Sequence, residues 1–166
     1  MSAASPGQIA DVGNGDRRRA DRLMHAPAAM TNSDVLRKLI RACVDDGRTL
    51  RNESKFVDPG RLKALMRLAS EREQFATDLE GLAKREQPHD GSWGELSREA
   101  ERDIWVAAAG GNNGDAIASC RRSRARTEAL YDEALQGSWP DEIQRVLAAQ
   151  RRRLHEEADE LNQLQV

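Results

Sequence analysis

A few polar residues interrupt the apolar rows of this sequence, and their types limit the chemistry that its interior can support. Asp46 and Glu53 fall within one row of apolar residues that recur every three or four positions. Three further rows are interrupted by Arg72, Arg124 and Gln150. Carboxylates inside a four-helix bundle are typical of a metal site. Arginines beside them instead predict an ion-paired core, because a buried charge needs a partner of opposite sign.

The metal interpretation has its own candidate ligands, which are Glu53, Glu71 and His155. A di-iron bundle takes carboxylates from all four helices and a Glu-x-x-His motif from two of them, since carboxylate oxygen and imidazole nitrogen hold the irons. No histidine follows Glu71 or Glu73 at the third position, and Arg152 stands three residues before His155. An arginine cannot ligate iron, and its charge repels the cation. We therefore expect no cofactor, with iron as the alternative.

Two orientations of Arg72 and Arg124 fit the pattern. In the first, their stems pack on the bundle and their guanidinium groups reach solvent. In the second, both turn inward, where Asp46 and Glu53 are their natural partners and Gln150 bridges the same polar layer. The inward arrangement is the hypothesis to test, because it would put an ionic layer where a metal layer would otherwise lie.

Four long amphipathic segments must position these side chains, since apolar residues at this spacing describe helices that pack into a bundle. The first spans about 32–56, and Asn32 or Ser33 can cap its free backbone N–H groups. The second spans about 59–85, with Asp58 as the cap and a proline at the first helical position. Gly47 lies inside the first segment and weakens it by roughly 1 kcal/mol relative to Ala, unless close packing needs the missing side chain.

The second half of the sequence predicts two more long helices, with a shorter one before them. The shorter helix is expected over Trp93–Ala109, and a run of Gly and Asn ends it. The next long helix has Asn113 or Asp115 as its cap and ends at Gly137, and the last follows Pro140 with Ser138 or Trp139 as its cap. The fold class expected is therefore all-α, a four-helix bundle with a short helix between the second and third long helices.

Composition indicates one structured domain. Aromatic residues make up only 4% of the 166 residues, so aliphatic side chains and alanine must fill the interior. Residues 1–31 are rich in Gly, Ala, Ser, Asp and Arg and predict a disordered N-terminal extension, whereas 32–166 predict the bundle. Met30 stands directly before a good helix start, which makes it an alternative first residue of the protein.

Charge and hydropathy argue against several partners. The net charge is −2 with both signs interspersed, so no basic face indicates nucleic-acid binding. No apolar run approaches the roughly 20 residues of a membrane span, and no apolar region marks a secretory signal. Cys43 and Cys120 fall on apolar rows, which predicts buried free thiols rather than a disulfide. We therefore expect a cytoplasmic protein without nucleic-acid or membrane partners.

Short stretches spread over about 32–164 carry a resemblance to a known family. In order they are Leu39–Gly47, Asp58–Leu65, Glu71–Leu79, Trp105 before Gly110-Gly111, Tyr131–Leu135 and Leu154–Glu156. This ordered set resembles a bacterial ferritin-like family of unknown function, a stress-associated group of four-helix-bundle proteins. The resemblance implies a ferritin-like bundle whose long crossover between the second and third helices is Trp93–Ala109. This chain departs from the family in its third long helix, where members tend to carry acidic residues and this chain has Arg124 and its neighbours.

Two classes of function follow from these observations. The first is a non-enzymatic ferritin-like bundle with a degenerate metal site, stress-associated as the resemblance implies, which acts as a homo-oligomer or through a protein partner. The alternative is an atypical ferritin-like iron-binding or oxidase protein that uses Glu53, Glu71 and His155. Other catalytic templates find no match, since the sequence has neither a phosphate-binding loop followed by Lys-Ser or Lys-Thr nor a Gly-x-Ser-x-Gly elbow.

Overall fold

The computed structural model describes residues 31–86 and 113–164, all within one compact unit, Thr31–Val166. These residues form long helices and contain no strand, which confirms the all-α prediction for this part of the chain. The helices are α2 (Asn32–Glu53), α3 (Pro59–Glu86), α5 (Asn113–Ala134) and α6 (Asp141–Gln163), with a 3-10 turn, η1 (Ser54–Phe56), after α2. The predicted helix Trp93–Ala109 and the predicted extension, apart from Thr31, lie outside the described residues.

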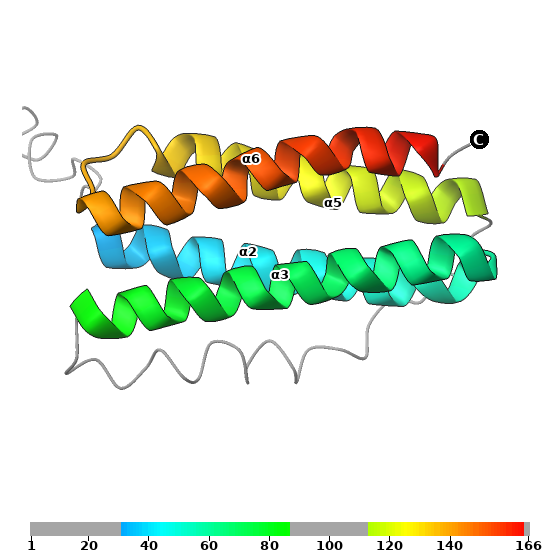
Figure 1. The fold of residues 1–166 in the computed structure, drawn as a ribbon, viewed down its shortest axis with the longest axis horizontal. Coiled ribbons are helices and arrows are strands. Elements are labelled where there is room, and N and C mark those ends of the chain that lie inside the picture. Colours follow the sequence, from blue (N-terminus) through cyan, green and yellow to red (C-terminus); the bar gives the residue numbers. More distant parts are fainter. Residues whose placement is uncertain (1–30, 87–112, 165–166) are drawn as a thin grey trace, which may run out of the picture. The chain divides into compact units, whose positions relative to one another are not determined.

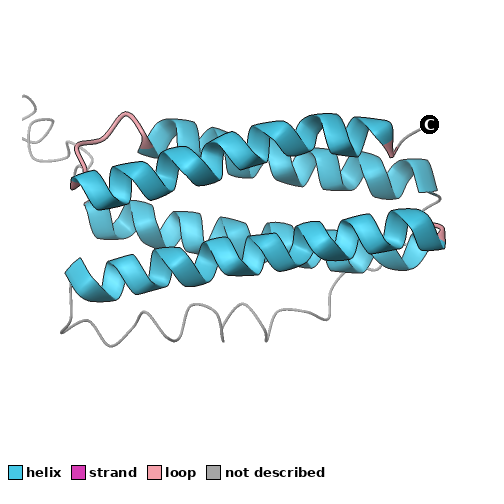
Figure 2. Cartoon of the chain, viewed as in Figure 1, coloured by secondary structure: helices cyan, strands magenta, loops and turns pink. Residues whose placement is uncertain are grey.

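Consecutive helices are antiparallel within the pairs α2–α3 and α5–α6, but the step from α3 to α5 keeps the same direction (Figure 1). α3 returns antiparallel to α2, and α6 returns antiparallel to α5. α5 runs in the same direction as α3, so the end of α3 and the start of α5 lie at opposite ends of the bundle. Figure 2 shows that the described connections between consecutive helices are short.

Three of the four neighbouring helix pairs pack with their backbones close together: α2 with α3, α2 with α5, and α5 with α6. Gly47 explains the first of these contacts. A Cβ atom at Gly47 would lie 3.2 Å from the Cβ of Arg72 and 3.3 Å from the carbonyl oxygen of Ala69, both on α3. The missing side chain therefore permits a close approach of α2 to α3, and this offsets the low helix propensity of glycine.

The apolar core consists of two clusters. One contains Cys43, Ala76, Tyr131 and Leu154 together with other aliphatic residues towards the start of α2 and of α6. The other contains, among others, Leu50, Ala69, Cys120 and Leu161. On each helix, the residues between these two sets include a buried polar side chain, and these side chains are Asp46, Arg72, Ser123, Thr127 and Glu157. A polar layer contributed by all four helices therefore lies between the two apolar clusters.

The helix ends follow local side-chain chemistry, with some differences from prediction. Thr31 caps α2 in place of Asn32 or Ser33. The Thr31 hydroxyl accepts from the backbone N–H of Asp34, and the Asp34 carboxylate accepts from the backbone N–H of Thr31. The prediction at α3 is confirmed, since Asp58 Oδ1 accepts from the N–H groups of Gly60 and Arg61 at 3.0 and 3.1 Å.

The ends of the other helices differ by a few residues. α2 stops at Glu53, and the segment that was expected to continue it is η1. α5 stops at Ala134 rather than Gly137. Pro140 itself takes the N-cap position of α6 and makes no side-chain hydrogen bond there, because proline has no polar side-chain atom to offer. None of the helices in the described ranges combines the length and the apolar character that a membrane span requires.

Candidate functional site

Arg72 occupies the centre of the polar layer, with none of its side chain exposed to solvent. Its Nε donates to Asp46 Oδ2 at 2.6 Å, and its Nη1 donates to Glu157 Oε1 at 3.1 Å. Nη2 donates to the other oxygen of Glu157, so the guanidinium binds that carboxyl in a bidentate manner. The guanidinium carbon also lies 5.2 Å from the centre of the Phe75 ring, within the range of a cation–π contact. A single arginine thus ties α3 to α2 and to α6.

Helical spacing explains why these three side chains meet. Arg72 follows Leu65 and Leu68 on the buried face of α3, and Glu157 lies between Leu154 and Leu161 on the buried face of α6. Residues three or four apart share one face of a helix. When the apolar residues of that face are buried, the charged side chains between them are buried as well. Each buried charge finds its counterpart on a different helix, which avoids the penalty of an isolated buried ion.

A second group of charges lies outside this centre and joins α3 to α6. Arg67 Nη1 lies 2.5 Å from Glu71 Oε1, and Glu71 Oε2 accepts from Arg153 Nε at 3.0 Å. Arg153 Nη1 lies 2.8 Å from Glu160 Oε1, and the other oxygen of Glu160 accepts from Arg67. The four side chains form a closed ring of alternating sign. Each is partly exposed, so we expect each link to stabilise the fold less than a buried one does.

Glu157 connects the buried centre to this outer ring. Its Oε1 lies 3.8 Å from Arg153 Nε, which also donates to Glu71 Oε2 at 3.0 Å. Burial raises the pKa of Glu157 to about 7, against the opposing effect of Arg72. The negative charge of the nearby Glu71 raises the pKa of Glu157 in the same direction as burial, because like charges disfavour the ionised form. A buried carboxyl with such a pKa can gain or lose its proton near neutrality.

A separate polar chain crosses the larger apolar cluster. Tyr131 is fully buried, and its hydroxyl donates to Gln150 Oε1 at 2.7 Å. The thiol of Cys43 lies 3.2 Å from the same hydroxyl, and Gln150 Nε2 donates to the carbonyl oxygen of Phe75 at 3.4 Å. Burial raises the pKa of Cys43 and of Cys120 to about 12, so neither thiol supplies a thiolate nucleophile near neutral pH.

The structure brings together only some of the residues that the sequence singled out. Asp46 and Arg72 form a buried pair. Gln150 is buried as well, but it belongs to the Tyr131 chain and not to the layer around Arg72. Glu53 is half-buried at the end of α2.

The expected pairing of Arg124 with Glu53 is replaced by another. Arg124 Nη1 donates to Glu128 Oε2 at 2.6 Å and to the carbonyl oxygen of Leu154 at 2.9 Å. Glu128 lies one helical turn further along α5, so it is within reach of the guanidinium without any contribution from α2. The side chain of Arg124 is 12% exposed and lies against α6 rather than in the central layer.

The metal candidates are not gathered into one site. Glu71 is engaged by Arg67 and Arg153, and His155, whose side chain is 68% exposed, contacts Glu128 at 3.1 Å. Within 31–86 and 113–164, no group of three or more His, Cys, Asp or Glu side chains is arranged to hold a metal ion. The donor set of the central layer does not fit a metal either, because the Arg72 guanidinium occupies the position between its two carboxyls.

Sequence reasoning missed Glu157. Its position three residues after Leu154 and four before Leu161 marks it as part of the buried row of α6. The adjacent Glu156 is exposed, so only the spacing separates the buried glutamate from its neighbour.

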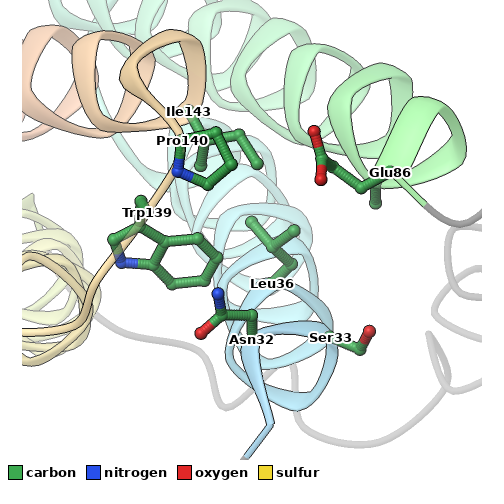
Figure 3. Close-up of a pocket in the computed structure, with 8 residues that line it drawn as sticks. Asn32, Ser33, Leu36, Glu86, Trp139, Pro140 and Ile143 are labelled. Carbon is green, nitrogen blue, oxygen red and sulfur yellow. The ribbon is translucent and has the colours of Figure 1, made fainter.

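A small pocket lies at one end of the bundle, away from these charges (Figure 3). It has a volume of about 210 Å³ and is formed by the first turns of α2 and α6 and the last turn of α3. Leu36, Ile143 and Trp139 supply apolar surface, and Glu86 is the ionisable group among its lining residues.

Comparisons with known proteins gave no matching family model, no matching curated protein and no matching solved structure.

Proposed function

We propose that this chain is a non-enzymatic ferritin-like bundle protein, stress-associated in role, in which an ionic layer stands where a di-iron bundle would hold metal. The observation that carries the proposal is the buried contact of Arg72 with Asp46 and Glu157. Three of the four oxygens of these carboxyls accept hydrogen bonds from Arg72, which leaves too few donors for an iron pair. The fixed positive charge also disfavours a cation beside it.

The helix directions support the ferritin-like part of the proposal. α3 and α5 run in the same direction, and a four-helix bundle with this arrangement needs one long crossover. That is the connectivity of ferritin-like folds, in which the metal ligands come from the middle of all four helices. Here the middle of the bundle is the polar layer around Arg72.

A protein without a catalytic centre acts through its surface, so the proposal includes binding to a second copy of the chain or to a protein partner. The interior charges are consistent with a scaffold role, since they engage one another. This part of the proposal is tested by sedimentation of the full chain over a wide concentration range. We expect a species larger than the monomer, and a monomer throughout would reduce the proposal to partner binding.

The non-metal part is tested by metal analysis of protein purified from an iron-supplemented culture, together with a ferroxidase assay. We expect no stoichiometric iron and no activity. The alternative function, an atypical iron-binding or oxidase protein, would show tightly bound iron. That iron would be lost in Glu53→Ala or Glu71→Ala. It would be kept in Glu156→Ala, which serves as the control because Glu156 is an exposed glutamate outside the proposed ligand set.

A further inference from the structure

The pocket at the end of the bundle combines a buried apolar floor with one acidic group at its rim. Leu36, Ala83 and Ile143 are buried and form the floor. Trp139 is half-buried beside them, and Glu86 is exposed at the edge. In the view of Figure 3, Trp139 and Glu86 lie on opposite sides of the pocket, with Leu36 and Ile143 between them. A ligand that fits this surface is apolar over most of its length and polar at one end.

Contacts among the pocket walls hold the cavity in place. Trp139 Nε1 donates to the carbonyl oxygen of Ala134 at 2.7 Å, which fixes the indole ring against the end of α5. Gly137 leaves room for the ring, since a Cβ atom there would lie 3.1 Å from Trp139 Nε1. Asn32 Nδ2 donates to the carbonyl oxygen of Ser138 at 3.1 Å and so ties the α5–α6 connection to the first turn of α2. The pocket is therefore preformed, as small-molecule sites usually are.

The ionisable side chains around the pocket favour a positively charged ligand. In the part of the chain that the structure describes, the Glu86 carboxylate has no ion-pair or hydrogen-bond partner. The two bases next to it are engaged elsewhere. Arg85 Nη2 lies 2.9 Å from Glu142 Oε1, and Lys84 Nζ lies 3.8 Å from Glu80 Oε2. The described lining of the pocket includes no basic residue, so the charge of Glu86 is left for a ligand to balance.

The helix ends that meet at the pocket do not cancel this negative charge. A helix carries a partial positive charge at its N-terminus and a partial negative charge at its C-terminus. α2 and α6 begin here, but Asp34 lies in the first turn of α2, and Asp141 and Glu142 lie in the first turn of α6. α3 ends here at Glu86, so its partial charge has the same sign as the carboxylate. The surroundings therefore suit a cation and disfavour an anion.

The volume of the pocket, about 210 Å³, limits the size of the ligand. An apolar cavity of about 150 Å³ is large enough to bind benzene. This pocket therefore has room for one ring or a short alkyl chain together with a small polar group. The hydrocarbon part would lie on the apolar floor, where its burial favours binding, and the polar group would reach the rim.

We propose that this pocket binds a small organic ammonium, with its hydrocarbon part against Leu36, Ile143 and Trp139 and its charged nitrogen beside the Glu86 carboxylate. The pocket lies at one end of the bundle, whereas the ionic layer lies in the middle. The inference therefore goes beyond the proposed function and does not depend on it.

The experiment titrates the ¹⁵N-labelled full chain with benzylammonium and follows the backbone and indole N–H signals by NMR. The Trp139 indole signal is assigned by its disappearance in Trp139→Phe, or by sequential assignment of the parent chain if that variant does not fold. Benzyl alcohol and benzoate have a similar shape but carry no charge and a negative charge, and methylammonium lacks the ring. We expect a saturable shift of the Trp139 signal, with benzylammonium bound more tightly than any of the other three probes.

A matched pair of variants tests the role of the carboxylate. Glu86→Gln keeps the size of the side chain and removes its charge. Because an exposed ion pair contributes little, benzylammonium should bind this variant about two- to fivefold more weakly, whereas the affinity for benzyl alcohol should not change. Glu156→Gln removes an exposed acid near the other end of α6 and should leave both affinities unchanged.

Three results would overturn the proposal. The first is the absence of a saturable shift of the Trp139 indole signal with benzylammonium. The second is an affinity for benzyl alcohol or benzoate that equals or exceeds the affinity for benzylammonium. The third is a Glu86→Gln variant that binds benzylammonium as tightly as the parent chain does. If that variant does not fold, the comparison of the four probes on the parent chain decides between a cation site and a merely apolar cavity.

Discussion

Removing the buried guanidinium is the most direct test of the ionic layer. The substitution Arg72→Met keeps an unbranched stem of similar length but leaves Asp46 and Glu157 without their shared partner. Loss of one member of a buried ion pair typically destabilises by about 3–5 kcal/mol, because the remaining charge stays out of water. Such a loss is a large part of the roughly 5–15 kcal/mol by which most domains are stable. We therefore expect a variant that is barely folded at neutral pH.

Matched variants separate this effect from the loss of a surface charge. Arg67→Met removes the same group from the outer ring, where the Arg67 side chain is 48% exposed, and should destabilise by about 0–1 kcal/mol. The triple change Arg72→Met, Asp46→Leu and Glu157→Leu removes the whole layer. It should recover most of the loss, since well-packed apolar groups often replace a buried ion cluster without penalty.

The assay is urea unfolding followed by far-ultraviolet circular dichroism, which reports the helices directly. The free energies of unfolding of the variants form a cycle, in which the triple change should destabilise far less than the sum of its single changes. If Arg72→Met destabilises by less than about 1 kcal/mol, or no more than Arg67→Met does, the guanidinium reaches solvent and the ionic layer is not buried in solution.

Three further expectations concern the packing around this layer. Gly47→Ala should destabilise by about 1–3 kcal/mol in the same assay, because its Cβ would meet a backbone oxygen of α3 at 3.3 Å. Gly81→Ala, also within a helix but with nothing within 4 Å, should stabilise by about 0.5–1 kcal/mol, and equal effects at the two glycines would contradict the close approach. Tyr131→Phe should lower the thermal midpoint through a loss of about 1–3 kcal/mol, since it leaves a buried amide oxygen without its donor, and an unchanged midpoint would argue that water supplies one. Cys43 and Cys120 should react with an aromatic disulfide reagent far more slowly in the native protein than in urea, because burial raises the pKa of both thiols to about 12, and equal rates would show that the core opens readily.

The helices were largely predictable because apolar residues at every third or fourth position can be recognised in one sequence. Asp58 and Pro59 placed the start of α3 correctly, since both have strong positional preferences. The cap of α2 was missed by one residue. Thr31, Asn32 and Ser33 are all good caps, and only the contact with Asp34 distinguishes Thr31 from the others.

The charged layer was less predictable, because spacing places a residue on a face but does not choose its partner. Asp46 was one of two candidate partners for the inward arginines, and it binds Arg72. The bidentate partner of Arg72, Glu157, stands in a run of two glutamates where local sequence does not tell buried from exposed. Arg124 was expected across the bundle and instead binds Glu128 on its own helix. Pairing of this kind depends on how the helices are rotated against one another, which a single sequence does not specify.

The polar layer between two aliphatic clusters also sets the alignment of the helices along the bundle axis. Leucine and alanine pack against one another in many ways, so a core made mostly of them tolerates a slide of one helix by a full turn, about 5.4 Å. Such a slide of α6 along α3 would carry Glu157 away from Arg72, break the bidentate contact between them in the interior and leave Arg72 with Asp46 alone. The apolar residues drive the helices together, and this one layer distinguishes the native register from its neighbours.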